Sequence, residues 1–172
     1  MPKKSKIPAF LNTGIEIHQY ARSILKQALS LSDETLQNDR LDSREHFGVQ
    51  PMLLALAMEF SLKAWFVFDY DKHKPDKVHD LAKLFVNLKD STKQRLNSEF
   101  QKTVAPLHPS VSLMSNNIRD ILSHHANAFI DWRYIYEEDR KKALLFETSV
   151  FVATLELFLD EFEKLYVTKE IK

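Results

Sequence analysis

The sequence predicts an all-α fold, a single-domain, up-and-down bundle of about five main helices. Apolar residues recur at three- and four-residue steps in several segments, which is the period of a helix with one buried face. Only two of the 172 residues are glycines, which disfavours a β-rich fold with hairpin turns. The length suits one domain with a sizeable core, which we assign to residues 1–172.

The first predicted helix covers about 14–31, where isoleucines, leucines and alanines share one face. Residues 1–12 precede it and are expected to be a flexible basic tail. Residues 32–50 are polar and lack a sustained apolar period, so they are predicted to be a connection with room for one short helix.

Residues 51–70 are predicted to form the central helix. Pro51 suits a helix start, and apolar residues then surround the axis almost completely. Glu59 and Lys63 have i,i+4 spacing and are expected to form a surface ion pair, although two buried groups that partner each other are the alternative.

Four further segments complete the predicted bundle. Apolar residues over 78–88 and over 96–104 predict two shorter helices, the second ended by a pair of prolines. A helix that begins at Ser110 or Ser112 is expected to continue to about residue 138. The last helix is predicted over about 144–166.

The amino-acid composition excludes several classes of function. Lysine plus arginine number 24, as do aspartate plus glutamate, so the formal net charge is zero. The chain as a whole therefore has no positive electrostatic field that would attract a polyanion such as nucleic acid. Cysteine is absent, which excludes disulfides, thiolate metal sites and cysteine nucleophiles. The N-terminus lacks the apolar stretch of a signal peptide, and no run approaches the roughly 20 apolar residues of a membrane span. We therefore expect a cytoplasmic protein with no membrane contact and no cofactor.

The helix predicted over 110–138 carries a polar stripe. Successive residues rotate by about 100°, which places five polar side chains along one face: Asn116, Asp120, His124, Asn127 and Asp131. His124, four residues from Asp120, could be held as a general acid or base, or it could belong to a solvated polar face. His125 falls among apolar residues, so it is either a core imidazole bonded to backbone or a binding residue.

Four segments carry a resemblance to a known family: a first helix of the Tyr20-Ala21-x3-Leu25 kind, then ALAMEFSLKAWF, then VHDLAKLF, and later AFIDWRYIYEE. Their order resembles that of the HEPN domain family (higher eukaryotes and prokaryotes nucleotide-binding) over roughly 14–166. The resemblance implies an all-α bundle that commonly forms homodimers. Many members are metal-independent endoribonucleases of toxin-antitoxin or phage-defence systems, and others are non-catalytic partners of nucleotidyltransferase-like proteins.

Nuclease members of that family carry an arginine and a histidine at R-x4-6-H spacing, which Arg119 and His124 match. The resemblance implies that His124 is the acid or base, that Arg119 stabilises the phosphate and that Asp120 tunes His124. The motif is short, and Arg40 with His46 matches it as well. On an unbroken helix Arg119 and His124 point about 140° apart, so they need a two-fold dimer or a helix break near Ser123 to converge.

The end of the same helix has two interpretations. Arg133, Tyr134 and Glu137 could line a nucleotide site, because guanidinium groups bind phosphate and aromatic rings stack on bases. Alternatively Arg133 pairs with Glu137 while Trp132 packs on Tyr136, which only stabilises a helix end.

The polar turn before residue 81 is a weaker candidate. Its histidines and aspartates, His73, Asp76, His79 and Asp80, lack a strong metal-site spacing, so we predict a solvated loop and no metal. His79 and Asp80 match the turn of the HEPN family, which favours a helix-capping or dimer-contact role.

The sequence thus favours a homodimer that binds or cleaves RNA or binds a nucleotide. The alternative is a non-catalytic interaction module, which could be the partner of a nucleotidyltransferase-like protein.

Overall fold

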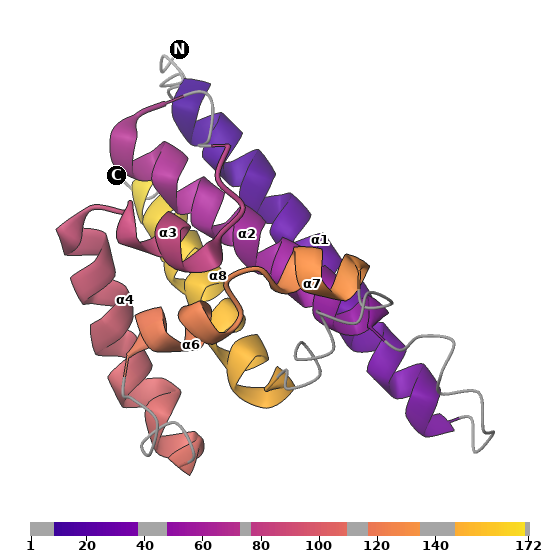
Figure 1. Ribbon diagram of the computed structural model, residues 1–172. Helices are drawn as coiled ribbons and strands as arrows, with labels where there is room; N and C mark the ends of the chain where they lie inside the picture. Colours follow the sequence, from indigo (N-terminus) through magenta and orange to yellow (C-terminus); the bar gives the residue numbers. More distant parts are fainter. Residues whose placement is uncertain (1–8, 38–47, 73–76, 110–116, 135–146, 171–172) are drawn as a thin grey trace.

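Long helices that pack side by side build the fold (Figure 1). The computed structural model describes residues 9–37, 48–72, 77–109, 117–134 and 147–170. α1 (Ala9–Gln37) and α2 (Val49–Tyr70) run in opposite directions along each other. Within the described ranges every regular element is helical and none is a strand, so the predicted all-α single-domain bundle is confirmed.

α1 is longer at both ends than the predicted helix over 14–31. Its buried seam includes Ala21, Leu25 and Ala28, as the apolar period predicts. Once a helix is nucleated, each added residue gains a backbone hydrogen bond, so polar flanking residues can continue it. Consequently residues 9–12 are helical rather than part of a flexible tail, and the predicted connection over 32–50 is helical up to Gln37.

α2 is the central helix, as predicted, and it begins two residues earlier at Val49. Gly48 precedes it with a left-handed φ of 89°, and a Cβ there would lie 2.8 Å from the ring of Trp132. Only glycine suits both the backbone and the space at this position. The helix ends at Asp71, which is also left-handed with a φ of 57° and whose amide donates to the carbonyl of Val67.

α2 also meets the length and composition criteria for a membrane span, contrary to the expectation from the sequence. In its most apolar stretch, however, 67% of the residues are buried inside the bundle. The core helix of a soluble protein has the same features, so this helix is only a weak indication of membrane insertion.

α3 (Leu81–Val86), α4 (Asp90–Thr103) and the short 3-10 helix η1 (Ala105–Leu107) follow. The carboxylate of Asp80 accepts a 3.0 Å bond from the amide of Lys83, which confirms the predicted capping role of Asp80. α4 is tied to the end of α2 because Asp69 accepts from the amide of Lys89 at 2.8 Å and from the hydroxyl of Thr92 at 2.6 Å.

The prediction of one continuous helix over 110–138 is wrong. The described part contains two short helices, α6 (Ile118–His124) and α7 (Ala128–Arg133), separated by a turn. In that turn the carbonyl of Ala126 accepts from the amide of Leu81, the first residue of α3. This tertiary bond satisfies a free donor at the start of α3, and it replaces the bond that a continuous helix would use. Ser110 and Ser112 lie outside the described residues.

α8 (Thr148–Glu170) closes the core against α1, α2 and α4. Trp65 of α2 donates its indole N–H to the carbonyl of Phe158 at 3.1 Å, and its ring meets the ring of Phe162 edge to face at 5.3 Å. A smaller apolar cluster joins α7 to α2 through Ala55, Ala128 and Trp132. The two clusters hold α6 and α7 across the middle of the bundle (Figure 1).

Candidate functional site on helix α6

α6 has one apolar and one polar side. Ile118, Ile121 and Leu122 are buried in the core, while Arg119 and His124 are exposed. Asn117 caps the helix by accepting from the amide of Asp120 at 3.0 Å, and the amide of Ile118 is bonded to Asn97 of α4 at 3.3 Å. The buried side and the cap therefore fix which residues of α6 face outward.

Arg119 and His124 do not converge within one copy of the chain. Both belong to the same helix, where five residues correspond to a rotation of about 500°, or about 140° of separation. The helix break that the sequence allowed comes after His124, so it leaves this separation unchanged. Arg119 lies on the flank of Ser123, whose hydroxyl donates to the carbonyl of Arg119 at 2.8 Å, and Asp120 lies on the flank of His124.

His125 has the core role that the sequence left open beside a binding role. Only 6% of it is exposed, its Nδ1 lies 2.8 Å from the carbonyl oxygen of Ile121, and its Nε2 accepts from the amide of Glu147 at 3.3 Å. Burial lowers the pKa of His125, in opposition to the backbone bond of Ile121. Nδ1 is thus used within α6, and Nε2 joins the end of α6 to the start of α8, which leaves neither nitrogen for a ligand.

The predicted polar stripe is interrupted by the turn. Asp120 and His124 lie on α6, whereas Asn127 and Asp131 belong to the start and body of α7. Asn116 lies outside the described residues. The stripe is therefore not one continuous helix face, because the chain changes direction at residues 125–127.

The proposed nucleotide-binding end of the helix is only partly described. α7 ends at Arg133, and the half-buried Tyr134 follows as its C-cap. Glu137 lies outside the described residues, and so does the side chain of Arg133. Trp132 is 7% exposed and packs on Ala55 of α2, whereas Tyr136, its predicted packing partner, lies outside the described residues.

Glu59 and Lys63 form an ion pair, but the prediction that it lies at the surface is wrong, and the alternative of two buried partners is confirmed. Glu59 is 3% and Lys63 is 8% exposed, with 2.6 Å between Nζ and Oε1. The exposed His79 contacts the same oxygen through Nδ1 at 2.9 Å, while Oε2 of Glu59 has no hydrogen-bond partner in the part of the chain that the structure describes. The almost complete apolar surface of α2 was the signal for this burial, since a charge on such a helix needs a partner.

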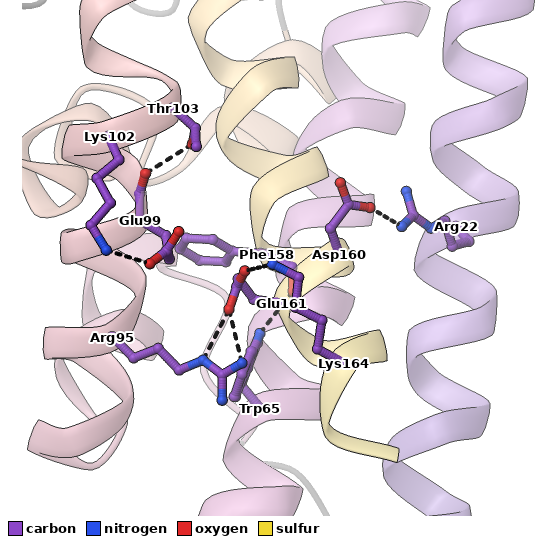
Figure 2. A network of polar contacts seen from close by, with 10 residues as sticks. All are labelled: Arg22, Trp65, Arg95, Glu99, Lys102, Thr103, Phe158, Asp160, Glu161 and Lys164. Carbon is purple, nitrogen blue, oxygen red and sulfur yellow. Dashed lines mark hydrogen bonds and ion pairs between the residues drawn. The ribbon is translucent and has the colours of Figure 1, made fainter. Parts of the chain in front are cut away.

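The carboxylates of Glu161 and Glu163 on α8 make further polar contacts that the sequence did not predict. Glu161 is 3% exposed and binds Lys164 and, at 2.9 Å, the guanidinium of Arg95 on α4 (Figure 2). Burial alone would raise the pKa of Glu161, but the hydrogen bonds from Lys164 and Arg95 outweigh it and lower the pKa. The network ties α4 to α8 and has the character of a structural ion pair.

Glu163 forms the corresponding link between α8 and α1. It lies 3.0 Å from Nε2 of the buried His18 and 2.9 Å from Nε of Arg22, which also pairs with Asp160. Burial lowers the pKa of His18 despite the opposing effect of Glu163. Bonds from Arg22 and His18 lower the pKa of Glu163 although burial opposes them.

Within the described ranges, no group of three or more His, Cys, Asp or Glu side chains could hold a metal ion. His73 and Asp76 of the polar turn lie outside those ranges. No family model, no curated protein and no solved structure gives a significant match to the chain.

Proposed function

We propose that this protein is a HEPN-like, cytoplasmic homodimer that cleaves RNA without a metal, through the polar side of α6. The observation that supports the proposal is the exposure of Arg119 and His124, with Asp120 beside His124, on a helix whose other side is fixed in the core. The resemblance to the HEPN family supports the substrate class and a role in toxin-antitoxin or phage-defence systems.

The chemistry needs one proton carrier and one cation. His124 would take the proton of a ribose 2′-hydroxyl or return one to the leaving oxygen, and Arg119 would stabilise the charge on the phosphate. Asp120, four residues before His124, would orient the imidazole.

A second copy of the chain would complete this site. Arg119 and His124 diverge on α6, so one phosphate could meet both only if they come from different protomers. In a two-fold dimer, such an arrangement gives two equivalent sites, each with Arg119 of one protomer and His124 of its partner.

The first test is RNA cleavage in EDTA by the wild type, Arg119→Ala and His124→Ala. We expect both variants to lose cleavage by at least about a hundredfold, in line with the usual contribution of an acid–base group. Lys102→Ala, which removes an exposed cation of α4, is the matched control and should cleave as the wild type does.

Mixing the two inactive variants tests the shared site directly. Half of the dimers would then be mixed, and each would hold one intact site, so about a quarter of the wild-type rate should return. A mixture that stays inactive, although light scattering and subunit exchange show mixed dimers, would exclude a site shared between protomers.

The divergence of Arg119 and His124 also supports a second candidate, a non-catalytic interaction module. In that case the polar side of α6 binds a protein, such as a nucleotidyltransferase-like partner, and adds specificity. The same two substitutions would then change association in light scattering, and no preparation would cleave RNA in EDTA.

A further inference from the structure

A groove with a volume of about 580 Å³ lies where the end of α2 meets the turn between α3 and α4. The side chains that define its character are Phe66, Tyr70, Lys72, Asn87, Lys89 and Lys93. This volume is within the usual range for small-molecule sites. The groove is separate from the residues of α6 discussed above.

Two aromatic rings form one wall of the groove. Phe66 and Tyr70 are one turn apart on α2, with 4.8 Å between their ring centroids. The Tyr70 hydroxyl donates to the carbonyl of Asn87 at 2.8 Å, which fixes the ring against the α3–α4 turn. Tyr70 is nevertheless 39% exposed, so part of a rigidly held ring faces solvent.

Two ammonium groups lie over these rings. Nζ of Lys72 is 5.5 Å from the centroid of Phe66 and 5.7 Å from that of Tyr70, and Nζ of Lys89 is 5.7 Å from that of Tyr70. No carboxylate among the described residues forms an ion pair with either lysine.

Lys93 differs from the other two lysines of the groove. It pairs with Asp90 at 2.9 Å and donates to the carbonyl of Val86 at 3.1 Å. The negative charge of Asp90 is thereby neutralised within the groove. Within the described part of the chain, the groove therefore presents two positive charges, Lys72 and Lys89, that lie over aromatic faces and form no ion pair.

A cation over an aromatic ring at an exposed site is held weakly, so a phosphate would be a stronger partner for both lysines. An exposed aromatic ring is in turn a surface on which any nucleobase can stack. We propose that this groove binds a nucleotide, with its phosphate between Lys72 and Lys89 and its base against Tyr70. The nucleotide is either free or a unit of single-stranded RNA, and the RNA form rests on the proposed function.

Calorimetric titration of the full chain with AMP tests the site. We expect the double variant K72Q/K89Q to weaken AMP binding by about tenfold or more. The matched control is K83Q/K102Q, which removes two exposed lysines outside the groove and changes the net charge equally. Equal losses in both double variants, or no AMP or RNA binding by the wild type, would overturn the proposal.

Ribose 5-phosphate, which has the phosphate without the base, tests the stacking surface. Tyr70→Leu should weaken AMP binding by roughly tenfold and leave ribose 5-phosphate binding unchanged. If Tyr70→Leu leaves AMP binding intact as well, the groove is an anion site only, and the nucleotide assignment is wrong.

A short 2′-O-methyl RNA strand, which lacks the hydroxyl needed for cleavage, separates the two sources of the ligand. Groove-dependent binding of this strand without AMP binding would identify RNA as the source, and the reverse would identify a free nucleotide. Groove-dependent AMP binding by a protein that cleaves no RNA would refute only the proposal for α6.

Discussion

Glu59 places a carboxylate in the interior of the bundle, where an unpaired charge is very costly. Lys63 and His79 both contact its Oε1, and Lys63 is itself almost fully buried. The attraction between two buried charges only partly offsets the loss of their hydration. Loss of one partner should therefore harm the fold more than loss of both charges.

The substitution Lys63→Met tests this arrangement. We expect it to lower the free energy of unfolding by about 3 kcal/mol, because it leaves Glu59 buried with the exposed His79 as its remaining contact. The double variant Glu59→Gln/Lys63→Met should be more stable than Lys63→Met alone. Urea denaturation measures both, with Lys102→Met as the exposed control, and a Lys63→Met curve that overlays this control would contradict the expectation.

At the scale of the helices, the two glycines allow a matched comparison. Gly48 has a left-handed φ and no room for a Cβ beside Trp132, whereas Gly14 lies inside α1, where a Cβ would meet its neighbours at 3.4 Å or more. Gly48→Ala should lower the free energy of unfolding by about 2 kcal/mol or more. Gly14→Ala should be neutral or stabilising by up to about 1 kcal/mol, because alanine favours the helix.

Thermal or urea unfolding of Gly48→Ala and Gly14→Ala measures both changes in the free energy of unfolding. Trp132→Leu in the Gly48→Ala background should recover part of the loss, since it removes the ring that the new methyl group meets. Equal stability of Gly48→Ala and Gly14→Ala would show that neither the backbone nor the ring constrains residue 48.

Helices with strong local signals were predictable from the sequence. The apolar period located α2 and α8, and Asp80 was expected to cap α3. The break between α6 and α7 was not predictable, because it depends on a bond from Leu81, which is distant in the sequence. Local patterns indicate where a helix can form, but a tertiary partner decides where it stops.

For the candidate site, too, local helical geometry was predictable and tertiary contacts were not. Helical rotation was sufficient to place His124 beside Asp120 and to separate it from Arg119, and both relations hold on α6. Whether the two side chains meet across a dimer does not follow from the sequence of one chain. The groove was missed because Tyr70, Lys72 and Lys89 are brought together only when the end of α2 meets the α3–α4 turn.

For the molecule as a whole, two buried histidines connect helices to α8. His18 joins α1 to Glu163, and His125 joins α6 to Glu147. Burial lowers the pKa of both imidazoles below the ordinary value of about 6.5, so the neutral form is favoured in the folded state. Their contribution to stability is complete above about pH 6.5 and is lost as the pH falls from there toward the lower folded-state pKa.

Melting temperatures measured from pH 7.5 down to pH 5 should therefore fall. The free energy of unfolding should change by at most about 1.4 kcal/mol per pH unit for each histidine. His125→Gln cannot titrate and should show a shallower dependence than the wild type. The lowered pKa values of Glu161 and Glu163 have their effect below about pH 4.5, outside this window. A flat profile between pH 7.5 and 5 would contradict the prediction.

The chain has two tryptophans, and they lie in different apolar clusters. Trp65 is enclosed in the main core between α2 and α8, while Trp132 lies where α7 meets α2. Their intrinsic fluorescence therefore reports on two places at once. In single-tryptophan variants, emission from Trp132 would follow the detachment of α7, and emission from Trp65 would follow the loss of the core. Comparison of the two signals gives a label-free measure of whether the region beside α6 opens before the bundle melts.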